Sequence, residues 1–447
     1  MSKYQAYSEY KDSGVEWISE IPAQWSSMSF GKAVQFMGNG ASATQIEENK
    51  DTVRVTRIET ISAGVINLDK VGHVRRFDIS PRFRLQRGDI QFSNINSLSM
   101  VGNCAIFVAN EELFSGMNLL HIRPDYNRVH SKYMLYQLKT KWFRNSVEAN
   151  AKPAINQASI PTGTLKQLGF LCPSLVEQEK IANFLDHETA KIDTLIDKQQ
   201  QLIQLLKEKR QAVISHAVTK GLNPNAPMRD SGVEWLGEVP EHWEMTRAKF
   251  VSNIFIPQRN KPELNDAEGT AWVTMENMKT SYIENTSLYV SRNASKVAGS
   301  KKLKKDSVIA SCVGNFGVAA INKVDVIINQ QLQAFIPFAI KAEYLRELVA
   351  MSTVYFELVG TAATLTYVNQ EGFENLPVLV PPANEQKKIC IYLEAENMKF
   401  ENLIDKAQSA IQLMQERRTA LISAAVTGKI DVSHWQVPAP MQSKEAV

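Results

Sequence analysis

Arginine and lysine residues gather in two short stretches of the sequence, and their side chains suggest the first chemistry to consider. Each stretch precedes a run of residues typical of a β-strand. Such cations can neutralise phosphates and release counterions, and arginine can also read the edge of a guanine. The alternative is a pair of solvated basic loops. The first stretch contains Arg75, Arg76, Arg82, Arg84 and Arg87, and the second contains Lys296, Lys301, Lys302, Lys304 and Lys305.

Amide side chains recur shortly before a long repeated segment in each half of the chain (177–221 and 385–429), where INQ (155–157) returns as VNQ (368–370). Asparagine and glutamine can read adenine, although a role at a turn or a strand end is the alternative. We take these amides, together with three further cations, as additional candidates for contacts with DNA. This second set consists of Arg54, Arg57, Lys152, Asn156, Gln157, Asn369 and Gln370.

Reactive groups in the spacings that enzymes use are not found in this sequence. There is no G-x-x-x-x-G-K-[ST] loop for nucleotide phosphates, and the seven histidines show no H-E-x-x-H spacing. The run Asn223-Pro224-Asn225 is followed by alanine, so it does not match the Asn-Pro-Pro-aromatic signature of amino-methyltransferases. The four cysteines lie far apart without a C-x-x-C pair. We therefore expect no active site, no metal ion and no cofactor bound by this chain.

An internal duplication organises the chain. DSGVEWISEIPAQW (12–25) returns as DSGVEWLGEVPEHW (230–243), and the long segment 177–221 is echoed by 385–429. Each half begins with the short repeated segment, here called the opener, continues with a variable segment and ends with the long repeated segment, here called the closer. Two copies are too few for a solenoid, so a pseudo-dyad is the better interpretation. We expect the four opener tryptophans to share a packing role, since residues that read two different DNA sequences should differ.

The closing segments are predicted to be two long helices. Neither contains proline between Glu177 and Thr219 or between Glu385 and Thr427, and apolar residues recur with a period near 3.5. We expect an antiparallel coiled-coil pair of about 43 residues each, roughly 65 Å long; the alternative is a helix lying on its own globular domain. The predicted seam contains Ile181, Leu185, Ile192, Leu195, Leu202, Leu206, Val213, Ile389, Leu393, Phe400, Leu403, Met414 and Leu421.

The ends of the two helices suggest how the halves connect. Gly221 and Gly428 can each supply the left-handed residue that stops a helix. The second opener follows directly on the first helix, so by symmetry the first opener should lie near the end of the second helix. The two chain termini are then expected to meet, which gives a pseudo-two-fold circular layout.

The two variable segments have the pattern of α+β domains. The first alternates strand-like runs at 51–61, 88–93, 104–109 and 119–124 with one helix from Ser131. The second has strand-like runs at 270–278, 286–291, 306–311 and 331–338, with the corresponding helix from Lys341. The fold class is therefore α+β, with two duplicated globular domains joined by two long antiparallel helices.

Length and composition are those of a multidomain globular protein. The 447 residues are 44% hydrophobic and 22% charged, with no run of 18 apolar residues, so a cytoplasmic protein is expected. Residues 26–170 hold 18 Lys and Arg against 11 Asp and Glu, whereas residues 244–376 hold 14 against 13. The expected parts are an opener (1–25), a first domain (26–170), a helical spacer (171–222), a connector with the second opener (223–243), a second domain (244–376), a second spacer (377–430) and a tail (431–447).

These parts resemble the specificity subunits of Type I restriction–modification enzymes along nearly the whole chain. The most specific matches are GVEWLGEVPEHW, the run P-x-x-x-EQ-x-K-I (173–181 and 381–389) and the endings AVTKG and AVTGKID. The resemblance implies that each variable segment is a target-recognition domain for half of a split, asymmetric DNA site. The helices would set the distance between the half-sites.

The resemblance also implies the partners. Two modification subunits that use S-adenosylmethionine to methylate adenine would dock on the helices and on parts of the recognition domains. Restriction subunits that use ATP and Mg²⁺ would join them. This chain would then be non-catalytic, with all cofactors on its partners. Two rival interpretations stay open: a coiled-coil scaffold whose domains bind proteins, and a self-sufficient DNA enzyme with an unfamiliar site.

Overall fold

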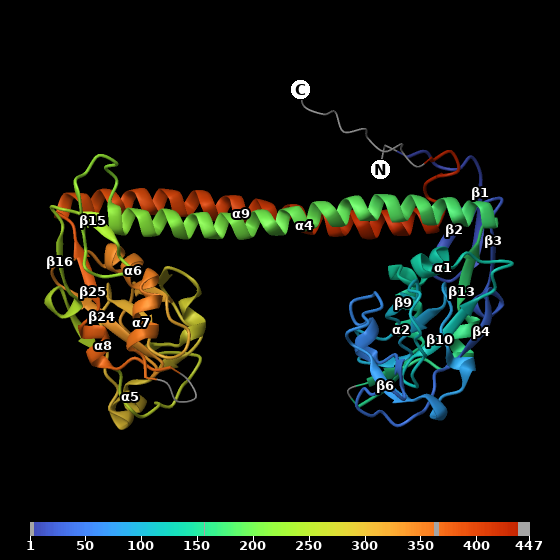
Figure 1. Ribbon diagram of the computed structural model, residues 1–447, viewed down its shortest axis with the longest axis horizontal. Helices are drawn as coiled ribbons and strands as arrows, with labels where there is room; N and C mark the ends of the chain where they lie inside the picture. Colours follow the sequence, from blue (N-terminus) through green and yellow to red (C-terminus); the bar gives the residue numbers. More distant parts are fainter. Residues whose placement is uncertain (1–3, 156, 362–365, 437–447) are drawn as a thin grey trace. The chain divides into compact units, whose positions relative to one another are not determined.

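A computed structural model of the chain describes residues 4–155, 157–361 and 366–436. It divides into two compact units (Figure 1). Unit one comprises Met1–Gln199 and Ser409–Val447, and unit two comprises Gln200–Gln408. Helices and strands are mixed in both units, so the α+β fold class is confirmed. In the described part of the chain, no helix is long and apolar enough to cross a membrane.

Two long helices dominate the closing repeats, as expected from segments rich in Leu, Ile, Lys and Glu without proline. Helix α4 covers Leu175–Lys220 and helix α9 covers Ala383–Val426. In unit one, the Arg418 guanidinium donates to both carboxylate oxygens of Asp193, at 2.8 and 3.3 Å. The beginning of α4 packs there against the end of α9, so the antiparallel pairing is confirmed.

Unit two contains the symmetry-related contact between the same helices. Arg210 stands at the position of the repeat that Arg418 holds in the other copy. Its guanidinium donates to Asn397 at 2.8 Å and to Glu401 at 3.2 Å. Each unit therefore has one arginine that ties the two helices together, and the duplication has kept this contact in both.

The seam between the helices differs in part from the predicted one. Leu195, Leu202 and Leu403 are exposed, so their assignment to the seam was wrong. The predicted series stepped by three from Ile192 to Leu195, whereas the buried stripe of α4 steps by four, from Ile192 to Ile196. An α-helix repeats every 3.6 residues, so a series with a period of 3.5 drifts away from the buried face. The other predicted seam residues are buried or half-buried: Ile181, Leu185, Ile192, Leu206, Val213, Ile389, Leu393, Phe400, Met414 and Leu421. Ile181 and Leu185 also pack into the globular core of unit one, as expected for a helix that lies on its own globular domain.

Glycines end both helices against the opener segments. Gly221 and Gly428 have φ angles of 72° and 70°, in the left-handed region that favours glycine. A Cβ atom on Gly221 would lie 3.0 Å from the Trp243 ring, and one on Gly428 would lie 2.3 Å from Pro22. The amide of Asp431 also donates to the Gln5 carbonyl at 2.7 Å. The described ends of the chain therefore meet in unit one, as predicted.

Unit one contains a four-stranded antiparallel sheet in the order β4-β10-β7-β9. Smaller sheets pair β1 with β2, β3 with β13, β5 with β6, and β12 with both β8 and β11. The elements before α4 are β1 (Tyr10–Val15), β2 (Ile18–Pro22), β3 (Ser26–Ser29), η1 (Phe30–Ala33), β4 (Val34–Asn39), β5 (Thr52–Val55), η2 (Ile58–Ile61), β6 (Gly72–Arg75), η3 (Arg76–Asp78), η4 (Pro81–Phe83), β7 (Ile90–Phe92), β8 (Ile95–Asn96), β9 (Cys104–Ile106), β10 (Leu120–Pro124), α1 (Ser131–Leu138), α2 (Lys141–Ala149), β11 (Lys152–Ala154), β12 (Gln157–Ser159), α3 (Thr162–Gln167) and β13 (Gly169–Cys172).

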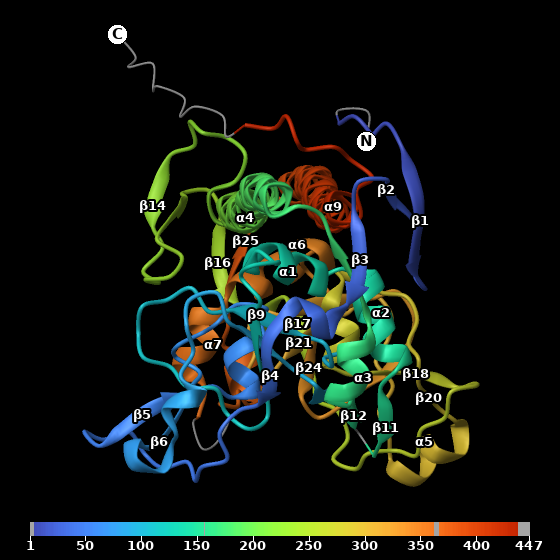
Figure 2. The same cartoon turned by 90° about the vertical axis from the view of Figure 1, so that its right-hand side faces the viewer.

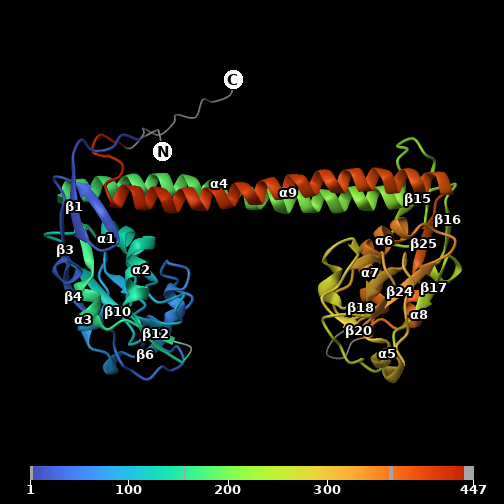
Figure 3. The same ribbon diagram turned by 180° about the vertical axis from the view of Figure 1, so that it is seen from behind.

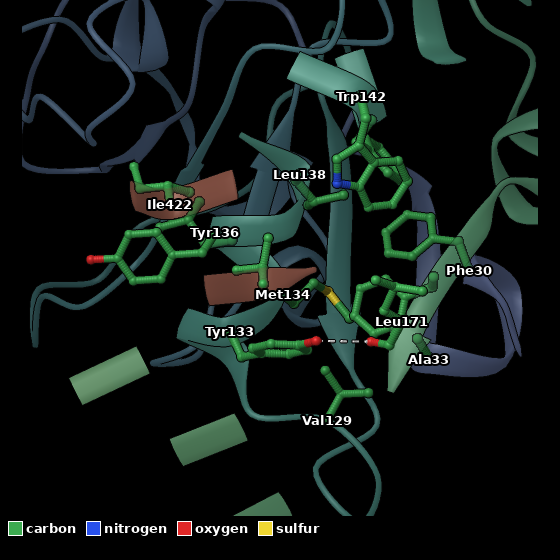
Figure 4. Packing of buried hydrophobic residues seen from close by; sticks show 14 of the residues in the cluster. Phe30, Ala33, Val129, Tyr133, Met134, Tyr136, Leu138, Trp142, Leu171 and Ile422 are labelled. Carbon is green, nitrogen blue, oxygen red and sulfur yellow. Dashed lines mark hydrogen bonds between the residues drawn. The ribbon is translucent and has the colours of Figure 1, made fainter. Parts of the chain in front are cut away.

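The core of unit one lies between this sheet, helix α1 and the long helices (Figure 4). Tyr133 is fully buried, and its hydroxyl donates to the Leu171 carbonyl at 3.2 Å. Gln137 satisfies both backbone groups of Leu171, with distances of 2.6 and 3.0 Å. Helix α1 is thereby fixed to strand β13, which leads directly into α4.

Unit two repeats this plan with a five-stranded sheet in the order β17-β24-β21-β22-β19. Figure 3 labels β17 and β24 of this sheet. Its other sheets pair β14 with β15, β16 with β25, and β18 with both β20 and β23. The elements are β14 (Met228–Asp230), β15 (Glu238–Pro240), β16 (Glu244–Arg247), η5 (Ala248–Phe250), β17 (Ser252–Phe255), β18 (Thr270–Val273), η6 (Met275–Lys279), β19 (Tyr282–Ile283), β20 (Tyr289–Val290), α5 (Arg292–Ala298), β21 (Val308–Ser311), β22 (Ala319–Asn322), β23 (Val326–Ile328), β24 (Leu332–Pro337), α6 (Ala342–Met351), α7 (Thr353–Val359), α8 (Gln370–Glu374) and β25 (Pro377–Val380).

The single helix expected in each variable segment is in fact two short helices. In unit one, α1 ends before Thr140, whose hydroxyl accepts a hydrogen bond from the Phe143 amide and so caps α2. In unit two, α6 and α7 are separated at Ser352. Apolar residues continue across both junctions, so the hydrophobic pattern alone gave no sign of the break.

The repeated EQ motif at the start of each long helix has a structural role. The indole of Trp25 donates to the Glu177 carboxylate at 2.9 Å, and that of Trp243 donates to Glu385 at 3.0 Å. Both tryptophans are buried, as the shared packing role predicts. Trp17 is 46% exposed, so the packing role was wrong for this residue, which lies in the tight turn between β1 and β2.

The glutamine of the same motif ties the helix to the domain before it. Gln178 donates to the Pro173 carbonyl at 2.9 Å, and Gln386 donates to the Pro381 carbonyl at 2.8 Å. Their side-chain oxygens accept from the amides of His130 and Lys341, respectively. The opener, the domain and the long helix are thus joined in the same way in both units.

Candidate DNA interface

The first basic cluster is built on the β5–β6 hairpin of unit one (Figure 2). Val53, Val55 and Val74 are buried in a small cluster with Phe114. Because side chains alternate along a strand, Arg54 and Arg75 point away from that cluster. Strand β6 lies at the end of unit one opposite the long helices (Figure 1). The hairpin therefore presents arginines on a part of unit one that the helices do not cover.

Arg76 and Arg84 of this cluster share one carboxylate. The Arg76 guanidinium forms two hydrogen bonds with Glu112, at 2.7 and 3.3 Å, and Arg84 lies 4.0 Å from the same side chain. The hydrogen bond from Arg76 holds the pKa of the Glu112 carboxyl below its ordinary value. Two cations and one anion leave a net positive charge, with Arg76 held in a fixed orientation.

Arg82 and Arg87 complete the cluster without an acidic partner among the described residues. The Arg82 guanidinium lies 4.5 Å from the centre of the Phe83 ring. Between the arginines, Phe77 is 95% exposed at the tip formed by η3. Sequence reasoning missed Phe77, although an aromatic residue inside a basic run is a signal for stacking on bases or for a wedge between base steps.

The remaining candidates of unit one lie in separate places. Arg57 pairs with Glu59 at 3.6 Å, beside the hairpin. Lys152 and Gln157 are exposed on β11 and β12, which belong to another sheet. Asn156 lies outside the described residues. The structure thus gathers the cations of 54–87 on and beside one hairpin, and it does not join Lys152 and Gln157 to them.

The second basic cluster precedes β21, the strand of unit two that holds the same sheet position as β7. Lys302 and Lys304 lie 3.5 and 3.2 Å from the Asp325 carboxylate. The backbone amide of Lys305 donates to Asp325, and this bond is the main cause that lowers the pKa of that carboxyl. Lys301 donates to the Ile256 carbonyl at 3.3 Å. Once again two cations share one acidic residue.

Helix α5 carries the rest of the second cluster. Ser291 caps it by accepting from the Ala294 amide at 3.2 Å, and Gly299 ends it at a φ of 62°. Lys296 is exposed on this helix, as is Arg292, which sequence reasoning missed. The helix lies at the end of unit two opposite the long helices (Figure 1).

Asn369 and Gln370 stand at the beginning of helix α8. The Asn369 side-chain oxygen accepts from the Gly372 amide at 3.0 Å and caps the helix. Gln370 donates to Glu374 at 2.6 Å. Both amides are engaged locally, which is the turn role given as their alternative.

A buried charged network that sequence reasoning missed lies beneath the first cluster. Asp89 is fully buried and accepts two hydrogen bonds from Arg123, at 2.9 and 2.7 Å. His121 is also buried, 2.7 Å from Asp89. Burial alone would raise the pKa of Asp89, but the hydrogen bonds from Arg123 and His121 together hold it below its ordinary value. Arg123 also reaches the Arg84 carbonyl at 3.5 Å, which links the network to the arginine cluster.

Groups of metal-ligating side chains are not found in the described part of the chain. The arrangement offers instead two exposed sets of cations, each on a loop before the same strand of a duplicated domain. Cations of this kind bind phosphates, and exposed guanidinium groups can also read bases.

Known proteins share this architecture. The family model described as the Type I restriction modification DNA specificity domain matches residues 240–407. The chain is 28% identical to the putative type I restriction enzyme MjaX specificity subunit of Methanocaldococcus jannaschii, covering 93% of this chain and 96% of that protein.

Two solved structures have the same fold. A chain from a type I R-M system, solved to explain complex assembly and conformational transition, has a TM-score of 0.67 at 15% identity, covering 92% of this chain and 99% of that one. The HsdS subunit of Thermoanaerobacter tengcongensis has a TM-score of 0.56 at 13% identity, covering 92% and 98%. The chain is therefore similar in sequence to DNA specificity subunits of Type I restriction enzymes, and it shares the fold of the solved structures.

Proposed function

We propose that the chain reads a split, asymmetric DNA site, with residues 26–170 on one half-site and residues 244–376 on the other. One observation carries this proposal. Each unit has its own sheet with the same order of corresponding strands, and each half of the chain ends in the same long repeated segment. Both units place basic residues before the corresponding strand, β7 or β21. The residues themselves differ, with arginines in the first and mostly lysines in the second. Two different half-sites require such a difference on a common scaffold.

The DNA-contacting residues are proposed from exposure and charge. In unit one, Arg54, Arg75, Arg82 and Arg87 have no acidic partner among the described residues, so their guanidinium groups can turn to phosphates or bases. In unit two, Arg292 and Lys296 have the same property on α5. Phe77 is proposed to contact the bases, because a fully exposed aromatic ring among cations is otherwise costly.

The long helices are proposed to set the distance between half-sites and to dock two modification subunits. Helix α4 has 46 residues, which at ~1.5 Å per residue gives a length of roughly 70 Å. The modification subunits would bring S-adenosylmethionine, and restriction subunits would bring ATP and Mg²⁺. The domain division given from the sequence is kept with this proposal, and the complex would act in the cytoplasm, where the DNA is.

A DNA-binding assay with the modification subunit tests the proposal. The affinity for duplexes that carry the site should fall steeply with salt. For each tenfold rise in salt concentration, the logarithm of the binding constant declines by about 0.9 per phosphate neutralised. Scrambling either half-site should weaken binding, whereas changing the bases between them should not. Affinity that is indifferent to salt and sequence would contradict the proposal and would favour a protein-binding scaffold.

A further inference from the structure

The two junctions between opener and long helices differ in how well they are covered. In unit one, Phe184 on α4 is completely buried. The ring of Tyr4 meets it edge-on at 5.2 Å, and the ring of Trp435 does so at 5.6 Å. The Tyr4 hydroxyl also donates to Glu188 at 3.3 Å. Two aromatic side chains, one from each end of the chain, therefore cover this face of the helix.

A side-chain hydrogen bond and apolar packing hold the segment that carries Trp435 in place. Lys180 donates to the Ser433 carbonyl at 2.6 Å, one turn of α4 before Phe184. Ile430 and Val432 are buried against the same core. The covering segment thus offers an aromatic ring and, two residues earlier, a carbonyl oxygen that binds a lysine.

In unit two, the corresponding surface of the long helix is not covered by two aromatic side chains. Aligning the closing repeats places Lys388 at the position of Lys180 and Tyr392 at that of Phe184. Tyr392 is 38% exposed, and Leu222, the counterpart of Ile430, is 42% exposed. A groove of about 620 Å³ opens here, lined by Lys209, Val213, His216, Leu222, Pro224 and Tyr392.

The difference follows from the number of segments that lie at each junction. In unit one, the segment around Gln5 and the segment around Asp431 lie side by side, so two segments cover the helix end. In unit two, a single connector runs from Gly221 to the second opener. The same alignment puts Pro227 at the position of Trp435, so the ring is missing as well.

We propose that this groove of unit two binds an extended segment of a modification subunit that carries an aromatic side chain. The ring would pack on Tyr392, and a carbonyl two residues earlier would accept a hydrogen bond from Lys388, as the chain's own tail does in unit one. A second copy of this chain is a poor occupant, because its Tyr4 and Trp435 already cover its own unit one. The inference rests on the proposed docking of modification subunits.

Three full-length variants test the inference in assembly with the modification subunit. Tyr392→Ala removes the surface on which the ring packs, and we expect about 10-fold weaker assembly, the upper range for an aromatic pair. Pro227→Trp supplies the missing ring from the chain itself and should compete with the partner to a similar extent. Ile391→Ala is the matched control, because Ile391 is exposed on α9 but does not line the groove, and we expect less than about a 2-fold change.

A crosslink identifies the occupant. A photoreactive phenylalanine analogue at position 392 should crosslink to an extended, aromatic-containing segment of the modification subunit, found by mass spectrometry. Crosslinks to a second copy of this chain, or wild-type affinity of Tyr392→Ala with an unchanged melting temperature, would overturn the inference while leaving the proposed function intact. If the wild-type chain binds no modification subunit at all, the proposed function fails and the inference fails with it.

Discussion

The basic loops of the two units follow one plan with different side chains. In unit one, Glu112 holds Arg76 and Arg84, and in unit two, Asp325 holds Lys302 and Lys304. Arginine can form two parallel hydrogen bonds with a guanine, whereas lysine is a flexible point charge. We therefore propose that unit one reads bases through guanidinium groups and that the lysines of unit two mainly contact phosphates.

The sheets beneath the loops differ as well. Asp89, the residue before β7, is buried with His121 of β10, and it contacts both His121 and Arg123 of the same strand. The strand pairing of unit two places Ser307, Ala334 and Ile336 at the corresponding positions. The common fold therefore does not need the charged network. In unit one the network anchors Arg123 beneath the arginine cluster, whereas unit two has a neutral sheet in its place.

Removal of Asp89 is expected to give the largest effect. Asp89→Ala leaves Arg123 and His121 without their buried partner, which should destabilise unit one by about 3–5 kcal/mol. Ser307→Ala is the control in unit two, with an expected loss of about 1 kcal/mol because it removes one hydrogen bond to the Lys304 carbonyl. Hydrogen exchange should show faster opening of β7 and β10 only in the first variant. Equal protection in both variants would mean that the network contributes little.

Single cations should separate base reading from phosphate binding. Arg82→Ala is expected to weaken specific binding by about 1–3 kcal/mol and to relax one position of one half-site. Arg84→Ala should cost less, because Glu112 already engages that side chain. Lys296→Ala should weaken all sequences alike and lower the salt slope by about 1. The control Lys166→Ala, on α3, should change neither, and a relaxed base position with Lys296→Ala would contradict the comparison.

Neutralising the two shared carboxylates should have a smaller effect, in the opposite direction. Glu112→Gln and Asp325→Asn each release two cations, and exposed ion pairs are worth about 0.2–1 kcal/mol. Binding to unspecific DNA should therefore tighten by up to about 5-fold in either variant. Competition titrations at two salt concentrations measure this change. Weaker binding would show that the carboxylates orient the cations for DNA and do not merely hold them.

The two units should also respond to acid in opposite ways. The pKa of Asp89 is lowered in the fold, so its stabilising contribution is complete above its unfolded value of about 3.9 and is lost as the pH falls through the folded value. Burial raises the pKa of the Glu347 carboxyl in unit two, although the charges of Arg346 and Arg210 lower it. The buried carboxylate therefore destabilises unit two at neutral pH, and this cost disappears as the pH falls toward the unfolded pKa of about 4.3.

Between pH 7 and pH 4, unit two should therefore gain stability relative to unit one, and below pH 4 unit one should weaken. Hydrogen exchange of β7 and β21 over this range measures the difference. Parallel changes in both strands would contradict the assignment of these two carboxyl groups.

The duplication made the long helices, the openers and the meeting of the chain ends predictable from the sequence. The cap at Thr140 leaves no clear mark in the hydrophobic pattern, so the break between α1 and α2 was missed. The exposure of Leu195 follows from the helical repeat of 3.6 residues per turn, which drifts from the assumed period of 3.5. Pairing of the cations was not predictable, because Glu112 lies 36 residues from Arg76 in the chain. The network around Asp89 was missed for the same reason, since strand pairing brings its members together.

Sequencing of DNA modified in a cell tests the central claim most directly. The chain is expressed with its modification subunit in a host that lacks other DNA methylation, and methylated bases are mapped across the genome. We expect a single bipartite, asymmetric motif with a fixed unspecific spacer, of which only one half changes when residues 244–376 are replaced by those of another specificity subunit. A contiguous motif, or a change in both halves, would contradict the account.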